Sequence, residues 1–302
     1  MRLDVYLSES GLVKSRETAK RMISEGGVTV NGNVVTKPSK EISENDNVAL
    51  CAPLPKYVGR GGLKLEKALD SFKISVNGLV CMDIGASTGG FTDCMLQNGA
   101  EYVYAVDVGH GQLDEKLLSD KHVKNMEGIN IKDLLPSELD REIQFISTDV
   151  SFISLKKVIP KIAELLCDNG QAVMLVKPQF ECGRADIGKN GIVRSDKVHR
   201  AVLSDIASFC SQNDLTVMGA NHSPIQGGDG NIEYLIYVIK GSVIGKPVDC
   251  AEIVSKAQRH ERSHIMKTVI WPNFSKKNAY ETTGKVCSML HNMGFEIFCG
   301  DI

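Results

Sequence analysis

Two lysines and two carboxylates in this sequence could form two ion pairs in one crevice. They are Lys64, Asp149, Lys177 and Glu233. A lysine that directly follows a buried strand is costly unless an acid pairs with it, and Asp149, which ends another apolar stretch, is a natural partner for Lys177. Lys64 and Glu233 can form a second pair. Because a hydroxyl group is a weak nucleophile at neutral pH, a cation beside its oxygen would stabilise the negative charge that develops there. For each residue taken alone, a structural ion pair explains the sequence equally well.

A glycine-rich segment, CMDIGASTGGFTDC at residues 81–94, has the pattern of a strand end, a tight turn and a helix start. Its glycines let the backbone approach a ligand without a Cβ in the way. The next apolar run ends in Asp107, where a carboxylate can accept hydrogen bonds from ribose hydroxyls. Ser87 stands where the dinucleotide fingerprint needs a glycine, so the spacing disfavours NAD-dependent oxidoreduction. The segment indicates a nucleotide-like cofactor site, with an ordinary strand-to-helix turn as the plain alternative.

Apolar strands alternate with helical stretches from Gly78 to Lys240, which is the pattern of a parallel sheet covered on both faces. An amphipathic helix is predicted over residues 63–72, with Lys64 near its start. Ligands of such sheets bind beyond the carboxyl ends of the strands, so the ionic residues are expected at that edge. The predicted strands are 79–84, 102–107, 144–149, 171–177, 215–221 and 233–240.

Residues 1–50 are predicted to form a small α+β unit. Ser15 can cap a helix that runs to about Glu25, and Val28–Val35 has the pattern of a hairpin with a type I′ turn at Asn31-Gly32, followed by a strand at 46–50. Its cations, with two from a Pro- and Gly-rich linker, could contact RNA phosphates, although a solvated helix face would have the same composition. The candidate RNA-binding residues are Arg2, Lys14, Arg16, Lys20, Arg21, Lys56 and Arg60.

These segments resemble known families. The glycine-rich segment with an acid at the next strand end looks like the S-adenosylmethionine site of Rossmann-like methyltransferases, and the first 50 residues resemble the S4 RNA-binding module. The order Lys64, Asp149, Lys177, Glu233 matches the K-D-K-E tetrad of the FtsJ/RrmJ-like RNA ribose 2′-O-methyltransferases. With GRGGLK, TDVSFISL, LVKPQF and GNIEYL, the chain resembles the TlyA/haemolysin A family over roughly residues 1–262.

The resemblance implies an α/β fold, in which a Rossmann-like methyltransferase sheet follows a small N-terminal S4-type α+β RNA-binding domain. It also implies S-adenosylmethionine-dependent 2′-O-methylation of cytidines in ribosomal RNA. Lys177 would stabilise the reacting oxygen, Asp149 would hold Lys177, and Lys64 with Glu233 would help to fix the hydroxyl. Whether Lys177 also acts as a general base stays open, because its neighbours act in opposite directions. The implied cofactor-binding residues are Asp83, Gly85, Ser87, Gly89, Gly90, Phe91, Asp107, Asn130 and Asp149.

Two other functions are compatible with parts of the sequence. A non-catalytic RNA-binding factor of ribosome assembly would keep the fold, but the intact tetrad argues against it. A pore-forming haemolysin is suggested by the family name, but the chain has no long apolar or strongly amphipathic membrane segment. The loop Gly227–Asn231, GGDGN, also occurs in NAD kinases; here it precedes Glu233, the place that the methyltransferase family gives it.

The composition indicates a globular protein of the cytoplasm. The formal net charge is −2, the N-terminus lacks the apolar core of a signal peptide, and the nine scattered cysteines contain no Cys-x-x-Cys pair. His260 and His264 lie four residues apart on a predicted helix, but no third metal ligand is evident, so no metal is expected. The oligomeric state is left open.

The C-terminal segment resembles a truncated NAD-kinase-like unit, with strands at 268–271 and 295–299 around a helix at about 276–293. The predicted division of the chain is an S4-like domain at 1–50, a linker at 51–62, an FtsJ-like methyltransferase domain at 63–262 and this appendage at 263–302.

Overall fold

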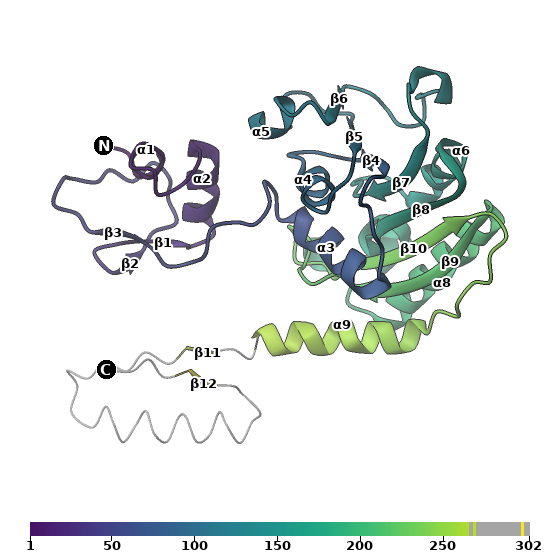
Figure 1. The fold of residues 1–302 in the computed structure, drawn as a ribbon. Helices are drawn as coiled ribbons and strands as arrows, with labels where there is room; N and C mark the ends of the chain where they lie inside the picture. Colours follow the sequence, from purple (N-terminus) through teal and green to yellow (C-terminus); the bar gives the residue numbers. More distant parts are fainter. Residues whose placement is uncertain (266–267, 270–296, 299–302) are drawn as a thin grey trace.

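The computed structural model describes residues 1–265, 268–269 and 297–298, and an extended linker joins a small N-terminal unit to a larger α/β unit (Figure 1). In the N-terminal unit, helices α1 (Leu3–Glu9) and α2 (Arg16–Ser24) share an apolar core with a three-stranded antiparallel sheet of order β2-β1-β3. The strands are β1 (Val28–Val30), β2 (Asn33–Val34) and β3 (Val48–Leu50).

Local sequence signals explain this unit. The Ser15 hydroxyl accepts a hydrogen bond from the backbone N–H of Thr18 at 3.2 Å and so caps α2. Asn31 and Gly32 have φ values of 53° and 77°, as the predicted type I′ turn requires. The predicted helix, hairpin and strand are therefore present, whereas α1 was not predicted.

The larger unit contains a seven-stranded sheet of order β6-β5-β4-β7-β8-β10-β9. Its strands are parallel except β10, which lies antiparallel between β8 and β9. The carboxyl ends of β4, β7 and β8 therefore share one edge with the start of β10. The strands are β4 (Val80–Ile84), β5 (Tyr102–Asp107), β6 (Val123–Glu127), β7 (Ile143–Thr148), β8 (Leu166–Val176), β9 (Leu215–His222) and β10 (Tyr234–Lys240).

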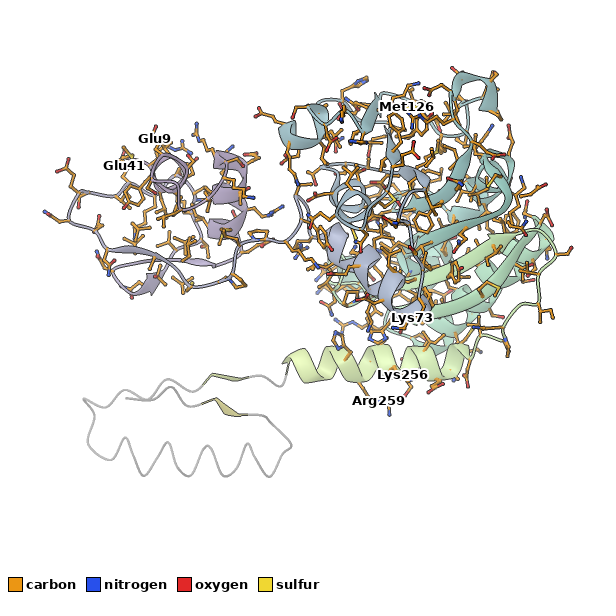
Figure 2. The ribbon with its side chains drawn as sticks, in the orientation of Figure 1. Glu9, Glu41, Lys73, Met126, Lys256 and Arg259 are labelled. Carbon is orange, nitrogen blue, oxygen red and sulfur yellow. The ribbon has the colours of Figure 1, made fainter. Side chains whose placement is uncertain are left out.

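Helices cover both faces of this sheet. On one face, α3 (Gly61–Phe72) and α4 (Gly90–Gln97) pack on a core that includes Leu65, Cys94 and Phe145. On the other, α6 (Ile159–Leu165), α8 (Asp196–Gln212) and α9 (Cys250–Ile265) share a core with Tyr104 and Met174. In α9, Val254 and Ala257 are buried, whereas Arg259 points away from the sheet (Figure 2). The short helices are α5 (Glu115–Leu118), α7 (Pro178–Glu181) and the 3₁₀ turns η1 (Pro136–Glu138), η2 (Leu155–Lys157), η3 (Arg184–Asp186) and η4 (Lys189–Gly191).

Three features of the larger unit differ from the sequence-based predictions. The edge strand β6 was not predicted, β8 begins five residues before the predicted strand at 171, and α3 begins at Gly61 rather than at residue 63. Of the C-terminal segment, β11 (Thr268–Val269) and β12 (Ile297–Phe298) form a parallel pair. The helix predicted at 276–293 lies outside the described residues. Among the residues described, no helix is long and apolar enough to cross a membrane.

Candidate active site

The four ionic residues meet at the carboxyl edge of the sheet. Lys64 lies in the first turn of α3, Asp149 directly follows β7, Lys177 directly follows β8, and Glu233 directly precedes β10. Lys64 Nζ donates a hydrogen bond to Glu233 Oε2 at 2.6 Å and lies 3.8 Å from Asp149 Oδ2. Lys177 Nζ lies 2.6 Å from Asp149 Oδ1. Asp149 thus contacts both lysines, and the four side chains form one continuous network.

The ion pairs are largely buried, and this burial affects the pKa of Glu233. The side chains of Lys64 and Lys177 are each 9% exposed and that of Glu233 is 3% exposed. Burial raises the pKa of Glu233 above its ordinary value, and the Lys64 ammonium acts against that rise. The contact between Lys177 and Asp149 Oδ1 is an ion pair whose angles miss those of a hydrogen bond, while Lys177 Nζ donates to Ser151 Oγ at 2.8 Å.

A cavity of about 130 Å³ lies beside the network. Gly85 has a φ of 83°, and a Cβ there would collide with the backbone oxygen of Asp149. A Cβ on Gly90 would lie 3.0 Å from the Gly62 nitrogen and 3.1 Å from the Gly59 oxygen, so α3 and the linker touch the glycine-rich turn backbone to backbone. The lining residues are Gly59, Arg60, Gly61, Gly85, Ala86, Ser87, Thr88, Gly90, Phe91 and Asp149.

The structure brings five of the predicted cofactor-binding residues to this cavity, namely Gly85, Ser87, Gly90, Phe91 and Asp149. Gly89 lies within the same turn but does not line the cavity. Asp107 is next to it, because its carboxylate accepts hydrogen bonds from the backbone N–H groups of Ser87 and Gly109 at 2.8 and 2.7 Å. Each oxygen keeps a lone pair that can accept from a ribose hydroxyl. Asn130 follows β6 and binds the backbone N–H of Lys132 at 3.2 Å.

Asp83 does not line the cavity. It is 1% exposed, and its Oδ2 accepts hydrogen bonds from the backbone N–H and the hydroxyl of Thr92 at 2.9 and 2.7 Å. Its Oδ1 accepts from the Ser147 hydroxyl at 3.3 Å. Burial raises the pKa of Asp83 to about 7. Asp83 therefore fastens the start of α4 to the sheet beneath the glycine-rich turn.

Sequence reasoning missed two parts of the site. The GRGG run was assigned to the linker, yet Gly59 and Gly61 line the cavity. Phe152 lies three residues after Asp149 with a φ of 62°, is 90% exposed, and has its ring 5.2 Å from that of Phe180. An aromatic residue in the strand-end loop TDVSF was the available signal for an exposed ring.

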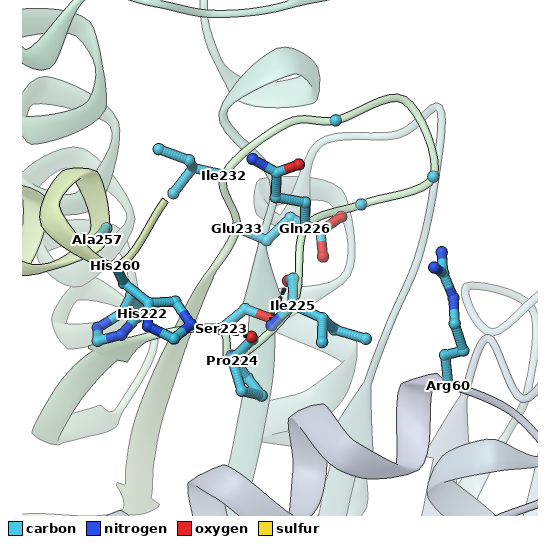
Figure 3. A pocket seen from close by; sticks show the side chains of 13 residues that line it. Arg60, His222, Ser223, Pro224, Ile225, Gln226, Ile232, Glu233, Ala257 and His260 are labelled. Atoms are coloured by element: carbon cyan, nitrogen blue, oxygen red, sulfur yellow. Dashed lines mark hydrogen bonds between the residues drawn. The ribbon is translucent and has the colours of Figure 1, made fainter. Parts of the chain in front are cut away.

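A larger cavity of about 510 Å³ lies on the other side of Glu233. Figure 3 shows Arg60 on one side and the neighbouring rings of His222 and His260 on the other, with Gln226 and Glu233 between them. The imidazole rings lie 5.2 Å apart, and burial together with His260 lowers the pKa of His222. Among the described residues, no group of three His, Cys, Asp or Glu side chains could hold a metal ion.

The predicted RNA-binding cations have different surroundings. Arg2 and Arg16 both bind the fully buried Asp4, each at 2.9 Å, and these contacts, with the Arg2 hydrogen bond as the largest, lower the pKa of Asp4 to about 2. Lys14 is exposed and lacks an ion-pair partner within the described part of the chain. The remaining contacts are those of Lys20 with Glu17, Lys56 with Glu66 and, at 3.8 Å, Arg60 with Glu25.

Arg21 connects the N-terminal unit to the linker. Its guanidinium donates hydrogen bonds to the backbone oxygens of Tyr57, at 3.1 Å, and Val58. The Val58 N–H in turn donates to Asp93 of α4 at 2.9 Å. A chain of contacts thus leads from α2 through the linker to the helix that follows the glycine-rich turn.

Two protein-family models match the chain: "S4 domain" over residues 1–48 and "FtsJ-like methyltransferase" over residues 57–240. "Putative rRNA methyltransferase YqxC" of Bacillus subtilis is 48% identical over 238 residues, 78% of this chain and 85% of that protein. "16S/23S rRNA (cytidine-2'-O)-methyltransferase TlyA" of Mycobacterium tuberculosis is 35% identical over 238 residues, 78% of this chain and 89% of that protein. The solved structure "Putative hemolysin from Streptococcus thermophilus" has a TM-score of 0.71 and 44% sequence identity, and the match covers 88% of this chain and 98% of that chain.

Proposed function

We propose, because this chain belongs to the FtsJ-like methyltransferase family, that it transfers a methyl group from S-adenosylmethionine to the ribose 2′-oxygen of cytidine in ribosomal RNA. The relative from M. tuberculosis is named for this reaction, and the relative from B. subtilis is named as an rRNA methyltransferase. The predicted family, the α/β fold with its N-terminal S4 domain, and S-adenosylmethionine as methyl donor are confirmed. The chain is thus an enzyme, and the continuous network of Lys64, Asp149, Lys177 and Glu233 beside the glycine-rich turn carries the proposal.

The groups of the cofactor site suit S-adenosylmethionine, because the glycine-rich turn gives access to the backbone and Asp107 offers hydrogen-bond acceptors. The cavity of about 130 Å³ is smaller than the whole cofactor, so we assign it to the sulfonium-bearing end, with the nucleoside extending past Ser87 to Asp107. Gly85 and Gly90 keep this turn free of Cβ atoms where backbone segments meet. When bound, S-adenosylmethionine would supply an electrophilic methyl group, so that a C–O bond would form as the S–C bond breaks, while the hydroxyl proton would pass to solvent water.

The tetrad would act on the ribose hydroxyl. Lys177, held by Asp149 and Ser151, would donate a hydrogen bond to the 2′-oxygen and stabilise the negative charge that develops there. Lys64, held by Glu233, would fix the same hydroxyl from the other side. Because each ammonium has a carboxylate beside it, we assign both lysines as hydrogen-bond donors rather than as bases. Most of the rate would then come from the alignment of the two reactants.

Phe152 supplies a surface for the RNA base. Its ring is 90% exposed, and its loop begins at Asp149, so an unstacked base could lie on it while the ribose faces the tetrad. The S4 domain would bind RNA through Lys14, Lys20 and neighbouring cations. Arg21 would act through the linker, because its guanidinium is already bound to Tyr57 and Val58.

We also propose the wider setting of the reaction. The partner would be the ribosomal subunit that carries the cytidine, and the site of action would be the cytoplasm. The division into 1–50, 51–62, 63–262 and 263–302 is supported by the separate apolar core of the N-terminal unit.

The test is methyl transfer from labelled S-adenosylmethionine to unmethylated ribosomal subunits, with ribose methylation mapped afterwards. Lys177→Ala should bind S-adenosylmethionine within about threefold of wild type but lose transfer by about 10² to 10³, the usual cost of removing a donor to a developing oxyanion. Lys121→Ala, which removes an exposed lysine far from the site, is the control and should match wild type. A Lys177→Ala enzyme that remains folded and methylates at the wild-type rate would refute the mechanism, and wild-type methylation of a base would refute the proposed reaction.

A further inference from the structure

The segment after Lys177 is unusually long for a connection between secondary-structure elements. From Cys182 to Ser195 it contains only the two 3₁₀ turns η3 and η4 before α8 begins. Connections of this length are uncommon in compact domains and usually have a function. Because it leaves the carboxyl end of β8, this segment lies at the same edge of the sheet as the tetrad.

Side-chain hydrogen bonds fasten this loop at both ends. At its start, Glu181 accepts hydrogen bonds from the Ser154 hydroxyl at 2.6 Å and the Leu155 N–H at 2.7 Å, in the loop that begins at Asp149. At its end, the side chain of Asn231, which is 1% exposed, binds the Gly191 oxygen and the Val193 N–H, each at 3.0 Å. The loop is thus held between the two segments that carry Asp149 and Glu233.

The fastened loop presents cations to solvent. Arg184, Lys189 and Arg194 are exposed, and none of them has an ion-pair partner in the described part of the chain. Over residues 183–197, four cations stand against two acids, Asp186 and Asp196, in a protein whose formal net charge is −2. Exposed guanidinium and ammonium groups without carboxylate partners are available to bind phosphate oxygens.

We propose that Arg184, Lys189 and Arg194 form a second RNA-binding surface, which holds backbone phosphates of the substrate RNA beside the tetrad. This proposal rests on the proposed function, because the reacting ribose must lie at Lys64 and Lys177 and its neighbouring phosphates must then pass this edge. The S4 domain binds RNA at a distance from the reaction, whereas the loop binds it where the ribose is presented. None of the three cations was predicted from the sequence to contact RNA.

The test compares two double variants of the full chain that lose the same charge. Lys189→Gln with Arg194→Gln removes two cations of the loop. Lys121→Gln with Lys246→Gln removes two exposed lysines near the amino ends of β6 and β9, at the opposite edge of the sheet. A triple variant adds Arg184→Gln to the loop pair. Melting temperature and S-adenosylmethionine affinity establish that each variant is folded and binds the donor.

Binding of transcribed, unmodified ribosomal RNA is then measured over a range of salt concentrations. For the loop pair, the slope of log K against log[salt] should become shallower by about 1.4 to 1.8, from about 0.7 to 0.9 per lost phosphate contact, with a further step for the triple variant. RNA affinity should fall about tenfold, and the KM for RNA should rise while kcat at saturating RNA stays within about threefold. The control pair should match wild type in all of these.

Two results distinguish a failure of the RNA-binding loop from a failure of the proposed function. If the loop variants bind RNA with the affinity and salt slope of the control pair while wild type methylates ribose, the loop is not an RNA-binding surface and the proposed function stands. If wild type binds RNA but methylates no ribose, the proposed function fails, and the binding measurements still decide the role of the loop.

Discussion

Glu233 and Lys64 form a pair that is expensive to bury. Taking two charges out of water costs several kcal/mol per ion, and their attraction need not repay that cost. Glu233 is 2% exposed, and burial raises its pKa even though Lys64 lies 2.6 Å away. A pair of this kind adds little to the stability of a fold, whereas the proposed reaction would make use of it.

The raised pKa of Glu233 predicts how activity depends on pH. Lys64 needs the carboxylate form of Glu233 as its partner, and that form is lost as the pH falls through a pKa above the ordinary glutamate value. The kcat/KM of wild type should therefore decline on the acidic side at a higher pH than an ordinary glutamate would give. Glu233→Gln should lower kcat/KM at least about tenfold near neutral pH and lack this decline.

Glu181→Gln is the matched control, because burial also raises the pKa of Glu181, which lies outside the tetrad. It should keep the acidic decline of wild type. The assignment of the decline to Glu233 is wrong if Glu233→Gln retains it.

At the level of elements, the glycine-rich turn depends on the fastening of α4 to β4. The Asp83 carboxylate holds the backbone and hydroxyl of Thr92, and its pKa of about 7 exceeds that of an ordinary aspartate. The folded state therefore binds the Asp83 proton more tightly than the unfolded state does. The resulting stabilisation is fully present at low pH and is lost as the pH rises through about 7.

Asp83→Asn should remove this pH dependence. An asparagine oxygen can still accept both hydrogen bonds from Thr92, and its amide can donate to Ser147. Between about pH 5 and about pH 8, the free energy of unfolding measured in urea should therefore fall more for wild type than for Asp83→Asn. Equal declines for the two proteins would mean that Asp83 does not titrate in this range.

The strands show what the sequence could predict at this scale. Continuous apolar runs such as Val80–Ile84 and Tyr102–Asp107 were located within one residue, because strands buried on both faces read as such runs. β6 was missed because its sequence, VKNME, has three polar residues among five and so lacks the apolar run of a strand that is buried on both faces. The early start of β8 depends on Ile143 pairing with Leu166 across a register shift, which only the tertiary structure specifies.

For the whole molecule, we expect the orientation of the N-terminal unit to depend on Arg21, which binds the backbone of the linker. Arg21→Met keeps the stem of the side chain but removes the donors to Tyr57 and Val58. The N-terminal unit should then sample more orientations, which small-angle X-ray scattering would detect as a larger radius of gyration, and the KM for RNA should rise several-fold.

Lys20→Met, one position earlier on the same helix, is the control for lost charge. It should weaken RNA binding with a shallower salt dependence but leave the radius of gyration unchanged. If Arg21→Met and Lys20→Met behave alike in both measurements, Arg21 contacts RNA rather than orienting the unit.

The sequence could predict which residues form the candidate site, but only part of their arrangement in space. Side chains at strand ends, such as Asp149 and Lys177, follow from the sheet pattern alone. The packing of Gly59 and Gly61 against the turn joins residues about 30 positions apart, and no local pattern encodes such a contact. The loop at 182–195 was equally inaccessible to sequence reasoning, because its anchors, Glu181 and Asn231, bind distant backbone groups.

The contact of Gly90 with Gly59 and Gly62 limits how this protein can be divided. The linker that joins the N-terminal unit to the larger unit also covers the cavity beside the glycine-rich turn. A fragment that starts at Leu63 would keep every tetrad side chain. It would lack the residues that cover one side of the cavity for the methyl donor. Insertions between Gly59 and Gly62 would separate the same contacts, so natural variation in the length of the linker should lie before residue 59.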